Sequence, residues 1–402
     1  MDATGARGDG DGPDIRLGTP GFYLRPDYHE VLAWLRRHAP VFATADGMVA
    51  LSRYEEVRDV SRDPERFVSG RGVLINDPLR DVDSGGLGAF SILHLDPPIH
   101  GAYRSVVNRL FTPRSVAPLE GRIRGVVRGV LDAVPTDEPV DLVDTLAAPI
   151  PLAVIAELLG VDGSDVGQLR RWSDATIESA DGSSEESAAL LGELLGFLTD
   201  RVRSAADPDG LLGVLATTPV GDRLLDEGEV VGFLLTLLVA GNETTRTLVS
   251  GGAEALARHP AQQALLAGDR SLLARAVEEM LRWVTPIQAF GHTAVVDVEL
   301  AGTPVPTGTF LVLLYASANR DEAAFGPDAG TFDVRRRTAA PHLAFGFGEH
   351  SCLGASLARL EARVFFEELL TRHPRFRLAG EPTYTSSTLV NGARSLPVVL
   401  DG

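Results

Sequence analysis

The most specific chemical feature of the sequence is the segment around its single cysteine, Cys352. Residues 345–354 read Phe-Gly-Phe-Gly-Glu-His-Ser-Cys-Leu-Gly. One thiol cannot form an internal disulfide, so its use is reactivity, metal ligation or packing as a buried structural cysteine. The glycines at 346 and 348 allow backbone turns that other residues resist, and residues 353–366 have the apolar spacing of an amphipathic helix. A cysteine at a helix N-terminus lies near unpaired N–H groups, which favour the thiolate that iron takes as a ligand.

A second unusual group lies inside a long apolar segment with helical spacing, residues 227–258. Residues 240–245 read Ala-Gly-Asn-Glu-Thr-Thr, and a glycine inside a helix costs roughly 1 kcal/mol relative to alanine. A threonine hydroxyl can bond to the carbonyl four residues earlier and bend the helix there. Glu243 and Thr244 are therefore either a functional acid–alcohol pair or a solvated pair beside a tolerated glycine, and the spacing alone leaves both readings open.

The order Phe-Gly-x-Gly-x-His-x-Cys-x-Gly over residues 345–354 resembles the haem-binding loop of the cytochrome P450 family at every defined position. The resemblance implies that Cys352 is the axial ligand of haem b, that Phe345 packs beneath the macrocycle, and that His350 reaches a haem propionate. Gly354 completes the pattern. In this family, thiolate ligation pushes electron density toward cleavage of the O–O bond.

The same resemblance places the acid–alcohol pair over the distal face of the haem. There Thr244 is expected to hold dioxygen and a water molecule, and Glu243 is expected to relay protons. Proton delivery of this kind is general acid catalysis through a chain of groups, and such steps contribute on the order of 10²–10⁴-fold.

Two further segments resemble family positions at the edge of the haem. His100 and Arg104 are four residues apart, so they share one helix face. The family implies that both contact propionates, because a planar guanidinium matches a carboxylate; a solvated surface pair is the alternative. At the opposite edge, this chain departs from the family, because His292 stands where the family usually has arginine. The resemblance implies that His292 contacts a propionate.

Glu279 and Arg282 have a three-residue spacing that puts an acid and a guanidinium on one helix face. Such pairs on a protein surface are common and worth little, but the family has a buried Glu-x-x-Arg pair that a second arginine joins. Arg336 is the predicted third member, and Arg335 and Arg337 stay open because the three arginines are consecutive. The expected role is structural: to orient the cysteine-bearing loop.

The residues that resemble the substrate pocket of the family are mostly aliphatic. A long glycine-rich segment without clear periodicity, residues 69–93, has the character of a binding loop. An apolar lining favours a terpenoid, steroid, polyketide or similar lipophilic substrate over a polar metabolite. The predicted pocket residues are Leu74, Phe90, Ile92, Thr236, Val239, Ala240, Ile287, Ala289, Phe290, Leu389 and Val390.

Residues 104–128 form a basic stretch in an otherwise acidic protein. Its six arginines, accompanied only by Glu120, are Arg104, Arg109, Arg114, Arg122, Arg124 and Arg128. Such a surface could dock an acidic ferredoxin, and a solvated helix face without a partner is the alternative. The sequence contains no recognisable flavin or iron–sulfur domain, so electrons from NAD(P)H are expected to arrive through a separate ferredoxin reductase and ferredoxin.

The 402 residues carry a formal charge of −18, which argues against nucleic acid as a partner. Residues 1–19 are predicted to be a disordered tail, because the first thirteen are polar and rich in glycine and aspartate. Residues 20–402 are predicted to form one haem domain. Residues 1–19 have the pattern of neither a signal peptide nor a membrane anchor. The longest apolar run of the sequence, residues 230–240, is too short to span a bilayer. We expect a cytoplasmic monomer.

Helical spacing dominates the chain, and strand patterns lie mainly near its two ends. The prediction is a mainly α protein with small β-sheets, in the cytochrome P450 fold. Predicted helices span 119–133, 142–159, 188–205, 227–258 and 271–283. Predicted strands span 41–44, 48–51, 295–300, 309–314 and 396–400, with a hairpin turn at 45–47.

The predicted function is that of a haem-thiolate monooxygenase that inserts one atom of dioxygen into a lipophilic small molecule. Two alternatives remain at this point. A peroxygenase would use hydrogen peroxide directly, although the intact Glu243–Thr244 pair argues against this. A non-catalytic haem-based gas or redox sensor would bind ligands without a hydrocarbon pocket or turnover.

Overall fold

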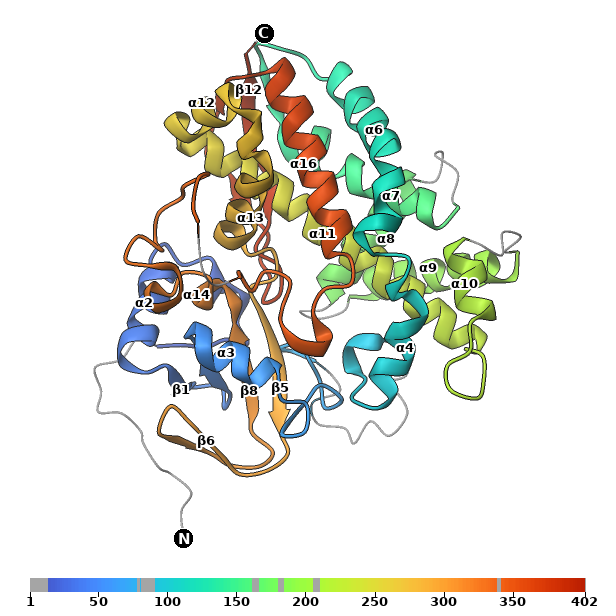
Figure 1. The fold of residues 1–402 in the computed structure, drawn as a ribbon, viewed down its shortest axis with the longest axis vertical. Helices are drawn as coiled ribbons and strands as arrows, with labels where there is room; N and C mark the ends of the chain where they lie inside the picture. Colours follow the sequence, from blue (N-terminus) through green and yellow to red (C-terminus); the bar gives the residue numbers. More distant parts are fainter. Residues whose placement is uncertain are drawn as a thin grey trace.

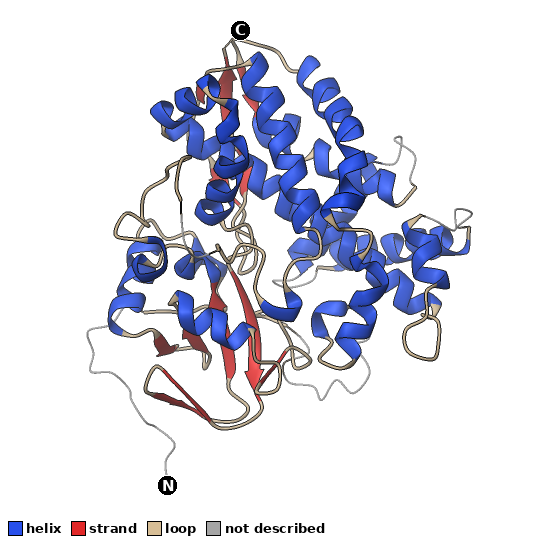
Figure 2. Cartoon of the chain, viewed as in Figure 1, coloured by secondary structure: helices blue, strands red, loops and turns tan. Residues whose placement is uncertain are grey.

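The computed structural model describes residues 14–77, 80, 91–160, 166–179, 184–204, 210–337 and 341–401. Helices make up one large part of the molecule. A smaller part contains the main β-sheet together with short helices, among them α2 (Tyr28–His38), α3 (Tyr54–Ser61) and α14 (Tyr315–Ala318) (Figures 1 and 2). None of the described helices is long and apolar enough to cross a membrane.

The main sheet joins residues from the start of the chain to residues near position 300. Its strand order is β1 (Val41–Ala43), β2 (Val49–Leu51), β8 (Phe310–Leu314), β5 (Ala289–Ala294) and β3 (Phe67–Val68). Strands β2 and β8 are parallel, and the other neighbours are antiparallel. The predicted hairpin around residues 45–47 is confirmed.

One strand prediction was displaced along the chain. Residues 295–300 were expected to form a strand, but strand β5 ends at Ala294, and only Val298–Leu300 (β6) of the predicted segment is extended. Strand β5 is buried along most of its length, so its sequence lacks the strict alternation of a half-exposed strand. It also contains Gly291, which pairs with Val312 of the central strand β8.

The predicted boundary between the tail and the domain was wrong for residues 15 and 17. Ile15 and Leu17 are buried with the aromatic residues of the short N-terminal helices. The hydroxyl of Tyr23 donates to the carbonyl of Leu17 at 3.0 Å. The packed chain therefore begins before Pro20, because two apolar side chains spaced by two residues reach the same face of this small core.

Helix α11 (Glu227–Arg258) is the axis of the helical part and has the bounds that its sequence predicts. It begins with a capping box: the Asp226 carboxylate accepts from the Glu229 N–H at 2.8 Å, and the Glu229 carboxylate accepts from the Asp226 N–H at 2.8 Å. The helices packed against it include α7 (Pro149–Leu158), α8 (Val166–Ser179), α9 (Glu185–Arg203), α13 (Leu273–Val284) and α16 (Ala355–Arg372).

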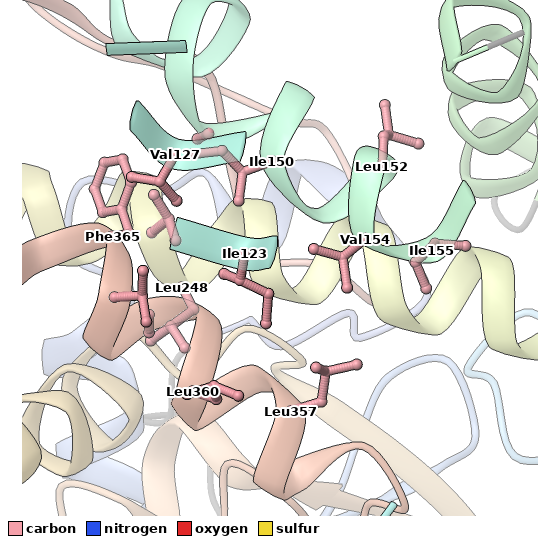
Figure 3. Packing of buried hydrophobic residues seen from close by; sticks show 14 of the residues in the cluster. Ile123, Val127, Ile150, Leu152, Val154, Ile155, Leu248, Leu357, Leu360 and Phe365 are labelled. Carbon is pink, nitrogen blue, oxygen red and sulfur yellow. The ribbon is translucent and has the colours of Figure 1, made fainter. Parts of the chain in front are cut away.

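The largest apolar core lies where α11 and α16 meet α6 (Glu120–Asp132) and α7. Figure 3 shows Ile123, Val127, Leu248, Leu360 and Phe365 converging from these elements. Each of these side chains contributes roughly 1.5–3 kcal/mol when it is fully buried. This packing fixes α11 and α16 relative to each other, and these helices carry or adjoin the predicted catalytic residues.

The segment 142–159 was predicted as one helix, but the structure divides it. A short π-helical stretch (Val143–Ala147) precedes α7, which begins at Pro149. Proline lacks a backbone N–H and is tolerated in the first turn of a helix but not in its interior. The prolines at 149 and 151 therefore start a new helix.

The remaining elements are short or peripheral. The other helices are α1 (Pro20–Tyr23), α2 (Tyr28–His38), α3 (Tyr54–Ser61), α4 (Ile99–Asn108), α5 (Pro113–Val116), α10 (Leu211–Thr217), α12 (Pro260–Gly268), α14 (Tyr315–Ala318) and α15 (Glu322–Phe325). The other strands are β4 (Pro139–Asp141), β7 (Thr303–Val305), β9 (Phe376–Leu378), β10 (Thr383–Tyr384), β11 (Ala393–Ser395) and β12 (Pro397–Leu400).

Candidate active site

The loop that carries Cys352 lies between β5 and α4, just before α16 (Figure 1). The Cys352 N–H donates to the carbonyl of Phe345 at 2.7 Å, which closes the loop. Gly346 and Gly348 have φ angles of 65° and 73°, which side chains rarely adopt. A Cβ at Gly348 would also lie 2.1 Å from the carbonyl oxygen of Ser61. The glycine spacing is therefore required by the turns of this loop.

Cys352 is exposed, yet desolvation by the surrounding protein raises the pKa of its thiol. The hydrogen bond from the Gly354 N–H lowers this pKa by a smaller amount. Both observations hold if the sulfur borders a hollow inside the protein, which we call the Cys352 hollow. An accessible sulfur does not fit a cysteine used only for packing. The predicted effect of a backbone N–H at the helix N-terminus is present, since the Gly354 N–H lowers the pKa of the thiol, but desolvation is the larger effect.

A series of contacts leads from the cysteine loop through β5 to α11. A Cβ on Gly346 of the cysteine loop would approach the Tyr315 hydroxyl at 4.0 Å. The Tyr315 ring centroid lies 6.3 Å from that of Phe290 in β5. Ile287 forms a β-bridge with Val390. The series reaches α11 at Gly392, where a Cβ would lie 3.6 Å from a carboxylate oxygen of Glu243.

Most of the predicted pocket residues keep some exposure although their elements lie inside the molecule. Ala240 is exposed in the middle of α11, and the partly exposed residues are Leu74, Ile92, Thr236, Val239, Ile287, Phe290 and Leu389. Ala289 and Val390 are instead 2% and 1% exposed. These two side chains therefore offer little surface to a pocket in this structure, and their place in its lining stays a prediction. Phe90 lies outside the described residues.

The acid–alcohol pair of α11 is split between two environments. The Thr244 hydroxyl is partly exposed and donates to the carbonyl of Ala240 at 2.5 Å, the bond that its position in the helix predicts. Glu243 is 1% exposed and lies 2.5 Å from Nη2 of Arg246. Burial raises the pKa of the Glu243 carboxyl, and the positive charge of Arg246 opposes this effect.

Two members of this network were missed by the sequence interpretation. Arg246 also donates to Asp174 of α8 at 2.9 Å, so it connects the buried acid to a partly exposed carboxylate. The three-residue spacing of Glu243 and Arg246 on one helix could have indicated the first contact. The contact with Asp174 depends on the packing of α8 against α11, which no local pattern predicts.

Nitrogen donors gather at one edge of the Cys352 hollow. The rings of His100 and His350 lie 4.0 Å apart, and Arg104 donates to the Ser351 carbonyl at 2.5 Å. Burial lowers the pKa of His350 to about 3, and the charges of His100, His292 and Arg104 act in the same direction. His292 is buried, its Nδ1 atom has no hydrogen-bond partner among the described residues, and burial lowers its pKa to about 4.

The structure selects Arg336 from the three consecutive arginines. Arg282 binds both carboxylate oxygens of Glu279, at 2.7 and 2.8 Å, and Nε of Arg336 lies 3.2 Å from the same carboxylate. Arg335 is paired with Asp333 instead. All three charges of the Glu279 group are largely buried, so removing one partner would leave an uncompensated charge.

The buried Glu279 group is connected to the cysteine loop through one asparagine. Arg282 donates to the Asn319 carbonyl at 2.8 Å, and the side-chain oxygen of Asn319 accepts from the Leu343 N–H at 2.6 Å. Leu343 lies two residues before Phe345. This chain of contacts supports the predicted structural role in placing the loop.

The basic stretch of residues 104–128 is largely neutralised by distant acids. Arg122 pairs with Glu157, and both Arg124 and Arg128 bind Glu368. Arg109 and Arg114 are exposed, and the described residues place no carboxylate within 4 Å of either guanidinium. The predicted docking surface is therefore much smaller than the sequence indicates.

Comparisons with known proteins agree with this geometry. The family model described as Cytochrome P450 matches residues 200–383. Linalool 8-monooxygenase of Pseudomonas putida is 35% identical over 405 residues, covering 96% of this chain and 98% of that protein. Vitamin D(3) 25-hydroxylase of Pseudonocardia autotrophica is 39% identical and covers 96% of each chain.

Solved structures show the same likeness. Cytochrome P450 CYP268A2 of Mycobacterium marinum, in complex with pseudoionone, superposes with a TM-score of 0.86 at 32% identity over 97% of this chain and 99% of that chain. A mutant of P450 EryK in complex with erythromycin B gives 0.84 at 33% identity, over 93% and 96% of the two chains. The chain belongs to the cytochrome P450 family, whose members bind haem, and is a monooxygenase.

The residues present fit a haem at the Cys352 hollow. The accessible thiol of Cys352 borders the hollow. A cation bound there would stabilise the thiolate and so offset the effect of burial on the pKa of the thiol. At the edge, the unpartnered Nδ1 of His292 and the neighbouring donors His100, His350 and Arg104 suit carboxylate groups such as the haem propionates.

Proposed function

We propose that this monooxygenase oxidises a lipophilic small molecule, using dioxygen and electrons from NAD(P)H that ferredoxin reductase and ferredoxin deliver. The observation that carries the proposal is an exposed thiol in the loop beside α4, together with partly exposed apolar residues such as Val239 on α11 and Phe290 on β5. The names of the relatives support the substrate class: linalool, steroids at C26, vitamin D(3) and methyl-branched lipids.

Cys352 would hold haem b as its thiolate, and the bound group would supply the iron at which dioxygen is activated. The Thr244 hydroxyl, partly exposed on α11, holds a water molecule and passes its proton toward the reacting oxygen. Glu243 replaces that proton from the side of Arg246 and Asp174, which connect it toward solvent. The aliphatic walls orient the substrate and exclude bulk water, which limits the loss of protons to side reactions.

The proposal is tested by turnover with separately purified redox proteins. A library of terpenoids, steroids and polyketides is screened for compounds that shift the haem spectrum, and each binder is incubated with NAD(P)H, ferredoxin reductase, ferredoxin and oxygen. We expect a product that is one oxygen atom heavier than its substrate. Product formed only with hydrogen peroxide would indicate a peroxygenase, and ligand binding without any product would indicate a sensor.

The pH dependence of haem binding should depend on His292. Without a propionate its pKa lies at about 4, and a neighbouring carboxylate raises the pKa of a histidine. At a pH between the pKa of His292 without the propionate and its raised pKa beside the propionate, haem binding is therefore accompanied by uptake of a proton. The added stabilisation is complete at low pH and is lost as pH rises through the raised pKa, with a limit of about tenfold per pH unit. We expect haem retention to weaken from pH 5 to pH 8 more steeply than in His292→Arg.

This dependence is measured as the rate of haem transfer to apomyoglobin across the pH range. Arginine stays charged throughout, so His292→Arg is the matched reference in which propionates and other histidines still titrate. Parallel curves for the two proteins would mean that His292 makes no contact with a propionate.

Ferredoxin-supported turnover should depend on Arg109 and Arg114 but not on Arg122. The first two guanidiniums lack acidic partners among the described residues, whereas Arg122 is paired with Glu157. We expect the single variants Arg109→Gln and Arg114→Gln each to lose about fivefold in turnover at low ionic strength. The loss should shrink at high salt, because exposed charges are screened beyond roughly 8–10 Å.

Arg122→Gln is the control, because it removes the same charge from the same stretch. Stopped-flow reduction of the haem protein by ferredoxin measures the effect directly. An equal loss in all three arginine variants, or a loss that is independent of salt, would contradict docking at Arg109 and Arg114.

A further inference from the structure

Two carboxylates hold together the chain segments 69–77 and 91–96. The first is Asp96, whose Oδ1 accepts from the Ser69 N–H at 2.7 Å and whose Oδ2 accepts from the Gly70 N–H at 2.9 Å. A Cβ at Gly70 would lie 2.8 Å from Asp96 Oδ2, so this close approach requires glycine. The Ser69 hydroxyl lies 3.4 Å from Nε2 of His350, which places this junction next to the cysteine loop.

The second carboxylate is Asp77, whose side chain is only 2% exposed. Its Oδ2 accepts from the backbone N–H groups of Val73 at 2.9 Å and Leu74 at 3.2 Å. The same oxygen lies 2.8 Å from Nε2 of His94. A buried carboxylate is stable only when it is well hydrogen-bonded. The His94 ring is therefore part of what allows Asp77 to be buried.

The contact between Asp77 and His94 joins two opposite walls of the Cys352 hollow. On one side, the carbonyl of Val73 accepts from the Gly291 N–H of β5 at 2.7 Å, beside Phe290. On the other side, the Ser91 hydroxyl, three residues before His94, lies 3.4 Å from the Thr236 hydroxyl of α11, whose proton goes to the Gly232 carbonyl at 2.9 Å. The bond between Asp77 and His94 thus connects a side chain of segment 69–77 to a side chain of segment 91–96, and the Asp96 bonds to the backbone of Ser69 and Gly70 connect the same two segments further along.

We propose that Asp77 and His94 form a latch that fixes the wall between β5 and α11 and so determines the affinity for large lipophilic substrates. Both are positioning residues. They act through the backbone of Leu74 and the turn at Ile92, and they belong neither to the cysteine loop nor to the Glu243–Thr244 pair. The inference rests on the proposed function, since it assigns the substrate wall of the same site.

The test compares two haem ligands of different size. Imidazole reaches the iron without filling the hollow, whereas clotrimazole ligates the iron and fills the hollow with three aryl rings. We expect His94→Leu to weaken clotrimazole roughly tenfold, the effect of losing one hydrogen bond to a charged group, and to leave imidazole unchanged. His94→Gln should restore most of the affinity, because its amide nitrogen can occupy the position of Nε2.

Asp77→Asn is the second test, since it removes the charge while it keeps the shape. We expect the same selective loss for clotrimazole. Asp63→Asn is the matched control: Asp63 accepts from the Arg66 backbone N–H in an exposed turn of the same part of the chain. Spectral titration gives both dissociation constants, and thermal unfolding shows which variants remain folded.

The outcomes separate the latch from the proposed function. If imidazole fails to shift the spectrum of the unmodified protein, the haem site itself is wrong. If imidazole binds and clotrimazole binds equally well to His94→Leu, His94→Gln and the unmodified protein, the latch is wrong. An equal loss of both ligands in folded His94→Leu would also overturn it, because the residue would then support the haem and not the substrate wall.

Discussion

Replacement of Cys352 by histidine should abolish the strongly red-shifted Soret band that carbon monoxide gives with the reduced, thiolate-ligated protein. Cys352 carries the only thiol of the chain, and its sulfur is accessible at the Cys352 hollow. We expect Cys352→His to bind haem, if it binds at all, with a globin-like carbon monoxide spectrum. Product formation should fall to background, because a neutral imidazole does not push electron density toward O–O cleavage as a thiolate does.

A change in the loop itself must be distinguished from loss of the ligand. Ser351→Ala alters the adjacent side chain, while the Ser351 carbonyl that accepts from Arg104 is kept. This control should retain the red-shifted band. If Cys352→His also retained it, the sulfur could not be the axial ligand, and the central assignment of the site would be lost.

Thr244→Ala should leave haem content and substrate binding intact but uncouple electron consumption from product formation. The hydroxyl is partly exposed on α11 and donates to the carbonyl of Ala240. Without it, protons are no longer positioned for O–O cleavage, and reduced oxygen escapes as hydrogen peroxide. A positioned proton donor contributes on the order of 10²–10⁴-fold, so we expect product per NAD(P)H to fall by about tenfold or more.

Two variants separate the proton role from the helix bond. Thr244→Ser keeps a hydroxyl and should keep most of the coupling. Thr217→Ala removes the same kind of hydrogen bond, since the Thr217 hydroxyl donates to the Gly213 carbonyl at 2.7 Å in α10, and it should not affect coupling. Peroxide and product are measured together with NAD(P)H consumption. Normal coupling in Thr244→Ala would show that the distal assignment is misplaced along α11.

The sequence by itself determined the elements that depend on neighbouring residues. Helix α11 has its predicted bounds because Asp226 and Glu229 cap its start and Pro260 follows its end. The glycines at 346 and 348 indicate a tight turn because their positive φ angles are a local property of the backbone. The bond from Thr244 to Ala240 follows from helix geometry alone, whatever packs around the helix.

The tertiary structure alone decided how charges and exposed faces are shared between distant segments. Arg122 and Arg124 meet acids that lie 35 and 244 residues away in the sequence, so their stretch is far less basic than its composition. Arg336 joins Glu279 across 57 residues, and the three consecutive arginines offered no local reason to prefer it.

The same division holds for the reactive thiol. The residues beside Cys352 predict its use as a ligand, but the sign of its pKa shift depends on the protein that surrounds the loop. Asp77 and His94 likewise lie in a segment without periodicity, and their contact exists because β5 and α11 bring both ends of it together. Backbone geometry and helix capping act over a few residues, whereas desolvation and charge pairing act through space, so only the folded chain determines them.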